Sequence, residues 1–119
     1  MEIKRIGSGN GSFSSAALAG GLIFISGQYG SADHPDISGQ ARELLENCDR
    51  LLAQCGSDKR HVLFASIYLN DIHNTLSAFN QVWREWVEVG FEPCRSCVGT
   101  QIAAPGYFAE VAFVAAPAD

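Results

Sequence analysis

Two stretches of the sequence are apolar at almost every position, and they constrain the fold more than any other feature. Residues 62–69 (VLFASIYL) and 108–115 (FAEVAFVA) are rich in β-branched and aromatic residues, which favour strands. A strand with one face in water alternates polar and apolar residues, whereas a strand covered on both faces does not. Both stretches therefore predict strands of a sheet that is covered on each face.

Two helices are predicted around the first of these strands. From about Gln40 to Cys55, apolar residues recur at spacings of three and four, and a glycine then supplies a stop. Asp71 and Asn74 are candidate caps for a second helix. In that segment apolar residues repeat at helical spacing up to Gly90.

The remaining segments complete the order of elements. Residues 22–26 and 95–102 are expected to be strands, and residues 7–15 and 31–39 irregular loops. The last two strands are expected to pair as a hairpin. The order strands, helix, strand, helix, two strands predicts one α+β domain over residues 1–119, with a mixed sheet and both helices packed on one face.

The second face of such a sheet has no cover within the chain. A chain of 119 residues supplies one modest core and a single layer of helices. Large apolar patches are rare on soluble monomers, so self-association is the economical way to bury this face.

Charge and composition restrict the function classes. Eight Lys and Arg residues stand against 13 Asp and Glu, for a net charge of −5. Nucleic-acid binding relies on a basic surface, because phosphate contacts supply most of the non-specific affinity, so we expect no nucleic-acid partner. No apolar run is long enough for a signal peptide or a membrane helix. We therefore expect no membrane association and a cytoplasmic protein with reduced cysteines.

Cys94 and Cys97 have the CxxC spacing of redox and zinc sites. Such sites need a helix start or a tight knuckle, but this segment is predicted to be a strand, in which side chains three residues apart point to opposite faces. The histidines, at positions 34, 61 and 73, do not stand at metal-ligand spacing. These patterns predict no metal site.

Arg95 and Glu110 are charged residues within otherwise apolar strands. A lone carboxylate is costly to bury unless it is paired or hydrogen-bonded. One interpretation places both side chains in water at a sheet edge or in a mutual salt bridge. The other is functional, because an arginine fork grips a carboxylate and a partly buried glutamate can transfer a proton. The residues alone leave both interpretations open.

Five segments together resemble the RidA (YjgF) family of reactive-intermediate deaminases, and the resemblance covers nearly the whole chain. Pro93–Val98 resembles the family's signature strand, and Phe108–Val111 its closing strand with a catalytic carboxylate. Phe24–Gln28, Val62–Asp71 and Phe79–Trp83 are similar to the early glycine-containing strand, the central strand and the second helix of the family.

The resemblance implies a chorismate-mutase-like α+β fold that assembles as a homotrimer, with the sheets forming an inner barrel. It also implies clefts between subunits that hydrolyse 2-imino acids and their enamine tautomers to 2-oxo acids and ammonia. No cofactor is implied, because a protonated imine is already electrophilic.

The resemblance also implies roles for particular residues. Arg95 is expected to hold the substrate carboxylate, and Glu110 to activate water and deliver a proton. Phe13 stands where many members have a tyrosine, so its ring is expected to cover the substrate without a hydroxyl hydrogen bond. The expected substrate-binding residues are Phe13, Ser26, Gly27, Asn80 and Cys97, with Gly27 and Cys97 acting through backbone N–H groups.

Two other functions are alternatives. A non-catalytic sensor of small 2-oxo carboxylates needs Arg95 but not Glu110. An endoribonuclease activity has also been attached to the family, but the acidic balance disfavours it, and no histidine pair suited to RNA cleavage is evident.

Overall fold

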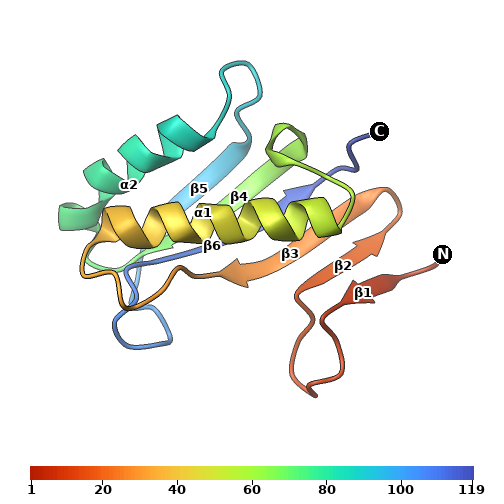
Figure 1. Ribbon diagram of the computed structural model, residues 1–119, viewed down its shortest axis with the longest axis horizontal. Helices are drawn as coiled ribbons and strands as arrows, with labels where there is room; N and C mark the ends of the chain where they lie inside the picture. The colour runs from red at the N-terminus through yellow and green to blue at the C-terminus, as the bar shows by residue number, and fades with distance from the viewer.

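The computed structural model describes all 119 residues and contains one six-stranded sheet with two α-helices on one of its faces (Figure 1). The elements in chain order are β1 (Lys4–Ile6), β2 (Ala16–Ala19), β3 (Leu22–Gln28), α1 (Ile37–Gln54), a 3₁₀ turn (Lys59–His61), β4 (Val62–Leu69), α2 (Ile72–Trp86), β5 (Cys94–Gly99) and β6 (Ala109–Ala115). The strand order is β1-β2-β3-β6-β4-β5. This arrangement confirms the predicted mixed sheet and the single layer of helices.

The predicted hairpin of the last two strands is wrong. β6 lies between β3 and β4 and is antiparallel to both, whereas β5 runs parallel to β4 at the edge of the sheet. The apolar β6 is paired with a strand on each side in the middle of the sheet. The more polar β5, which carries Cys94, Arg95 and Ser96, stands at the edge. β5 also ends at Gly99 rather than at residue 102, because its partner β4 ends at Leu69, whose carbonyl accepts the last hydrogen bond, from the Thr100 amide.

Both helices differ from the sequence prediction at their ends. α1 begins at Ile37 instead of Gln40, because the Asp36 side chain accepts a hydrogen bond from the Gly39 amide at 2.8 Å and so caps the helix. Asp71 occupies the N-cap position of α2, as predicted. Its side chain makes no cap bond, however, and instead accepts from the Asn74 side-chain amide.

The core lies between the sheet and the helices. Every second residue of β6, from Ala109 to Ala115, is buried, and β4 buries Ala65, Ile67 and Leu69 on the same side. The apolar sides of α1 and α2 pack against them; their largest buried side chains include Leu44, Leu52 and Phe79. Neither helix is long and apolar enough to cross a membrane.

The other side of the sheet, which we call the open face, is apolar and uncovered in the single chain. Phe24 of β3, Phe64 of β4 and Val98 of β5 are 48%, 37% and 47% exposed. Between them the half-buried residues Ala112 and Val114 of β6 continue the surface. The predicted unmatched apolar face therefore exists.

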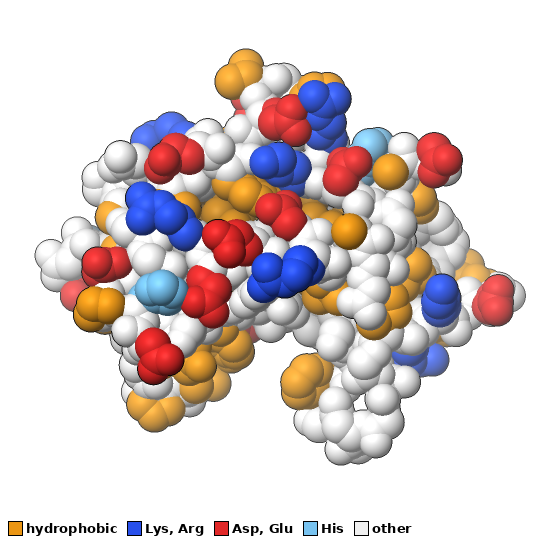
Figure 2. Space-filling view, viewed as in Figure 1, with side chains coloured by type: hydrophobic (Ala, Val, Ile, Leu, Met, Phe, Trp, Pro, Cys, Tyr) orange, Lys and Arg blue, Asp and Glu red, His pale blue; other side chains and the backbone are white.

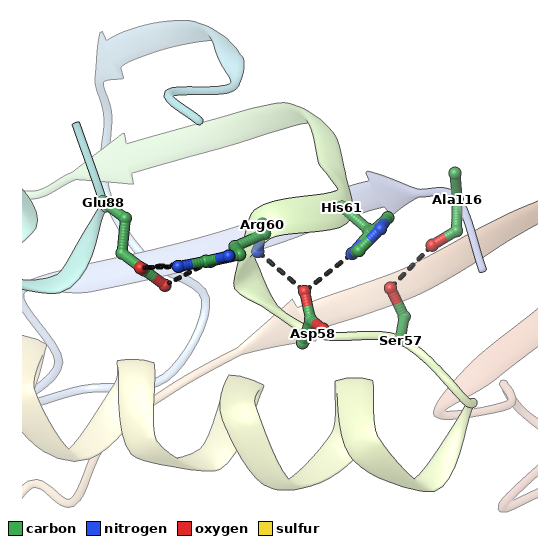
Figure 3. Close-up of polar contacts among 6 residues, drawn as sticks. All are labelled: Ser57, Asp58, Arg60, His61, Glu88 and Ala116. Atoms are coloured by element: carbon green, nitrogen blue, oxygen red, sulfur yellow. Dashed lines mark hydrogen bonds and ion pairs between the residues drawn. The ribbon is translucent and has the colours of Figure 1, made fainter. Parts of the chain in front are cut away.

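The 3₁₀ turn before β4 is fixed by polar contacts that Figure 3 shows. Arg60 forms a two-pronged ion pair with Glu88, and Asp58 accepts from the Arg60 amide and contacts His61 Nδ1 at 2.7 Å. The Ser57 hydroxyl donates to the Ala116 carbonyl. The chain segments that enter β4, leave α2 and follow β6 are thereby held together.

Candidate active site

Arg95 lies on the helix-covered side of the edge strand β5. Its register partner on β4 is Ala65, which is fully buried under the helices. One guanidinium nitrogen donates a hydrogen bond to Asn80 Oδ1 of α2 at 2.8 Å. The guanidinium carbon also lies 5.6 Å from the centre of the Trp83 ring, within reach of a cation–π attraction. Arg95 is therefore oriented by α2 while its other N–H groups stay available.

Glu110 lies on the open face of β6. Its register partner on β4 is Tyr68, which in turn pairs with Val98 of β5, so the three side chains share one face of the sheet. The carboxylate rests directly over Gly27, where an added Cβ would collide with it. A break in the β3–β6 register between Ile25 and Gln28 creates this close approach.

Arg95 and Glu110 of one chain therefore lie on opposite faces of the sheet. The chain has one Arg–Glu ion pair and two His–carboxylate contacts, and neither Arg95 nor Glu110 belongs to any of them. The mutual salt bridge that the sequence left open is thus absent. Side chains on opposite faces cannot act on one small substrate within a single copy, so a joint site needs two copies.

The loop before β2 lies beside Phe24 and Ser26 of β3, close to Gly27 and Glu110. Phe13 is 64% exposed and lines a shallow hollow together with Ser14, Phe24 and Ser26. The Ser26 hydroxyl donates to the Ser14 carbonyl at 2.6 Å, so this hydroxyl anchors the loop. The predicted residues Phe13, Ser26 and Gly27 thus come together around β3, and Gly27 touches Glu110.

Cys97 shares the Arg95 side of β5, whereas Cys94 is exposed on the other side. Burial raises the pKa of the Cys97 thiol, and the Arg95 charge opposes this only in part. Cys97 is therefore a neutral thiol at neutral pH. The two sulfurs do not converge, as the strand prediction requires.

Asn80 also lines a hollow of about 470 Å³, with Leu76, Ser77 and Arg84 of the same helix. Two residues near the site were missed as functional candidates. Trp83, whose ring faces the Arg95 guanidinium, belongs to the apolar repeat of the second helix, a pattern that predicts packing and no role in a site. Tyr29 follows β3, and burial together with the nearby Glu110 carboxylate raises its pKa.

The histidines and the surface charges are dispersed. His34 contacts Glu43 and His61 contacts Asp58, each at 2.7 Å and at the surface. Figure 2 shows Lys, Arg, Asp and Glu side chains intermingled over the helix-covered face, with no large area of one sign. No histidine pair forms, and this face offers no basic surface for a phosphate backbone.

Comparisons with known proteins agree with this fold. A family model described as "Endoribonuclease L-PSP" matches residues 3–117. The RutC family protein YoaB of Escherichia coli is 31% identical, over 98% of this chain and 99% of that protein. A RutC family protein of Haemophilus ducreyi is 29% identical over 87% of this chain and 88% of its own length.

A solved structure is similar over the whole chain. The crystal structure of a YjgF family member from Neisseria meningitidis superposes with a TM-score of 0.93 at 39% identity, covering 100% of this chain and 98% of that chain. The fold of the chain is therefore that of this solved structure. The chain therefore belongs to the RidA/YjgF family, which the family model describes as endoribonuclease L-PSP.

Proposed function

We propose that this protein hydrolyses 2-imino acids to 2-oxo acids and ammonia in clefts between the subunits of a homotrimer. In each cleft, Arg95 of one subunit meets Glu110 of its neighbour. The observation that supports this most is the placement of the two side chains on opposite faces of the sheet, each without a partner of opposite charge. Because Arg95 stands on the edge strand β5, a second copy whose β5 edge packs against the open face would bring its Arg95 to Glu110.

Arg95 supplies the grip on the substrate. A guanidinium donates two parallel hydrogen bonds to a carboxylate, which fixes both the position and the plane of the substrate. Asn80 and Trp83 already orient the group, so little side-chain freedom is lost on binding. Backbone N–H groups of Gly27 and Cys97 orient the remainder of the substrate.

Glu110 supplies the proton transfers. Its carboxylate takes a proton from water as the water oxygen attacks the carbon of the protonated imine, which gives a neutral carbinolamine. Glu110 then gives this proton to the carbinolamine nitrogen. Ammonia leaves as the hydroxyl proton of the carbinolamine returns to the Glu110 carboxylate, which gives the 2-oxo acid. The same group acts first as base and then as acid, and such transfers contribute about 10²–10⁴-fold to a rate.

A coupled assay tests this function. An amino-acid oxidase generates different imines, and semicarbazone formation is followed with and without the protein. Faster loss of the imine with wild-type protein, and not with Glu110→Gln, supports the proposal. Equal semicarbazone yields with every imine tried contradict it.

A binding module for 2-oxo carboxylates is the second candidate, because Arg95 is oriented by Asn80 and Trp83 without any contribution from Glu110. A sensor predicts that 2-oxobutyrate binds equally to wild type and Glu110→Gln while neither clears imines. RNA cleavage, which the description of the family model suggests, would need to survive Arg95→Ala and repeated purification.

A further inference from the structure

A tyrosine flanks Glu110 on each side, one on β4 and one directly after β3. Tyr68 of β4 is its register partner. On the other side, Gln28 at the end of β3 pairs with Val111, so the next residue of the chain, Tyr29, arrives beside Glu110. The site residues implied by the family resemblance include neither tyrosine.

Tyr29 is held in place from two directions. Its carbonyl accepts a hydrogen bond from Asn47 Nδ2 of α1 at 2.9 Å, and its ring packs against Tyr107, with 4.8 Å between centroids. The buried Gln40 fixes Tyr107 in turn. The Gln40 side chain donates to the Gly106 carbonyl at 2.8 Å and accepts from the Phe108 amide at 2.7 Å. The half-buried Tyr29 ring therefore has little freedom to leave Glu110.

The Glu110 carboxylate is confined as well, because it rests against the backbone of Gly27. The pKa of Tyr29 is raised above its ordinary value. Burial is the largest cause, and the charge and hydrogen bonding of Glu110 come next. The phenol therefore keeps its proton through the neutral and mildly alkaline range and acts as a donor.

We propose that Tyr29 is a positioning residue for the reaction: its hydroxyl donates to one oxygen of the Glu110 carboxylate and leaves the other oxygen for the attacking water. This inference rests on the proposed function, since it assigns to Glu110 the activation of water. Tyr29 does not itself need to touch the substrate.

The variant Tyr29→Phe removes the hydroxyl and keeps the ring against Tyr107. A donor to a carboxylate favours the charged form, so its loss makes Glu110 easier to protonate. We expect the acid limb of the pH–rate profile to move to higher pH. At neutral pH we expect kcat to fall about tenfold with little change in KM, the size typical of one hydrogen bond to a charged group.

A measurement without substrate checks the same contact. In a protein carrying ¹³C-labelled glutamate, the Glu110 carboxyl resonance, identified by its absence in Glu110→Gln, is titrated. It should titrate at higher pH in Tyr29→Phe than in wild type. Tyr107→Phe, which loses the hydroxyl of the stacked ring instead, is the matched control and should titrate like wild type. An unmoved titration in Tyr29→Phe, or an equal shift in Tyr107→Phe, overturns the inference.

A double variant separates this inference from the proposed function. If Tyr29 acts through Glu110, adding Tyr29→Phe to Glu110→Gln costs no further activity. A full additional loss in the double variant refutes the positioning role while leaving the deaminase intact. If Glu110→Gln alone clears imines as fast as wild type, the proposed function is what fails.

Discussion

Asn80 Oδ1 accepts a hydrogen bond of 2.8 Å from the Arg95 guanidinium, and this bond joins helix α2 to the edge strand of the sheet. The bond fixes the orientation of the Arg95 side chain, which would otherwise be flexible at the edge of the sheet. Neutral acceptors such as Asn leave the charge of the arginine uncompensated, which an aspartate at the same place would not. The arrangement suits an arginine that must attract an anion from outside the chain.

Arg95→Ala should abolish most of the carboxylate binding. Hydrogen bonds to charged groups are worth on the order of 1.5–3 kcal/mol, so loss of the fork should cost about 3 kcal/mol, roughly a hundredfold in Kd. Arg95→Lys keeps the charge without the fork and should bind only weakly. Titrations with 2-oxobutyrate and thermal melts on the same samples measure this. Unchanged affinity with a lowered Tm would show that Arg95 is structural.

Asn80→Ala should weaken the same binding by a smaller factor. Arg95 keeps its charge and the Trp83 ring but loses the acceptor that orients it, for which about tenfold in Kd is expected. Gln81→Ala, an exposed neighbour on α2, is the matched control and should bind like wild type. Equal Kd values for Asn80→Ala and wild type would remove Asn80 from the site.

Local patterns predicted the order of the elements but not the pairing of the strands. The apolar stripes of α1 and α2 follow from short-range periodicity. The insertion of β6 between β3 and β4 depends on contacts across the whole chain, which no local pattern encodes. Asp36 was missed as the cap of α1 because the glycine and proline around it favoured a loop.

The site was predicted as a set of residues, not as a geometry. The family resemblance singled out Arg95 and Glu110, yet their faces depend on the register of β5 and β6 against β4. A shift of one residue in either pairing would have put both on one side. Tyr29 was missed because only the break in register near Gly27 brings it beside Glu110.

The stability of the 3₁₀ turn should depend on pH through Asp58. The hydrogen bond from His61 is the main cause that lowers the pKa of Asp58 below its ordinary value. A carboxyl whose pKa is lower in the folded state stabilises the fold above its unfolded pKa, and this contribution is lost as the pH falls through the folded value. Because the pair is at the surface, we expect at most about 1 kcal/mol.

The variant Asp58→Asn isolates this contribution. Urea unfolding should show wild type more stable than the variant near pH 6, where Asp58 is charged. The difference should shrink as the pH falls through the lowered pKa of Asp58, because the protonated carboxyl and the asparagine amide are both uncharged. A difference that persists unchanged in acid would contradict the prediction, because asparagine keeps an oxygen that can accept from the Arg60 amide and differs from aspartate in its charge.

Gly27→Ala should impair turnover more than binding. The added methyl group would occupy the place of the Glu110 carboxylate, so the carboxylate must move away from the bulge. Overpacking of this kind costs about 1–3 kcal/mol of stability, and we expect kcat to fall about tenfold or more. Kinetics and 2-oxobutyrate titration compare the two effects. If kcat stays at the wild-type value, the position of the carboxylate over Gly27 is not required.

Substitution on the open face should dissociate the oligomer. Phe64, at 37% exposure in the single chain, stands among other apolar side chains, so the wild type should scatter light as a trimer at micromolar concentration. Phe64→Asp would bury a charge without a partner in that interface, a cost of several kcal/mol per ion, and should give monomers. Val89→Asp is the control, because Val89 is 93% exposed in the segment after α2 and should leave the trimer intact.

The same samples connect assembly to activity. Arg95 and Glu110 of one chain lie on opposite faces of the sheet, so a Phe64→Asp monomer should retain both side chains and yet clear no imines. Circular dichroism should show that the monomer keeps its sheet and helices. A folded monomer with wild-type activity would contradict the cleft between subunits, and a wild type that scatters as a monomer would contradict the trimer.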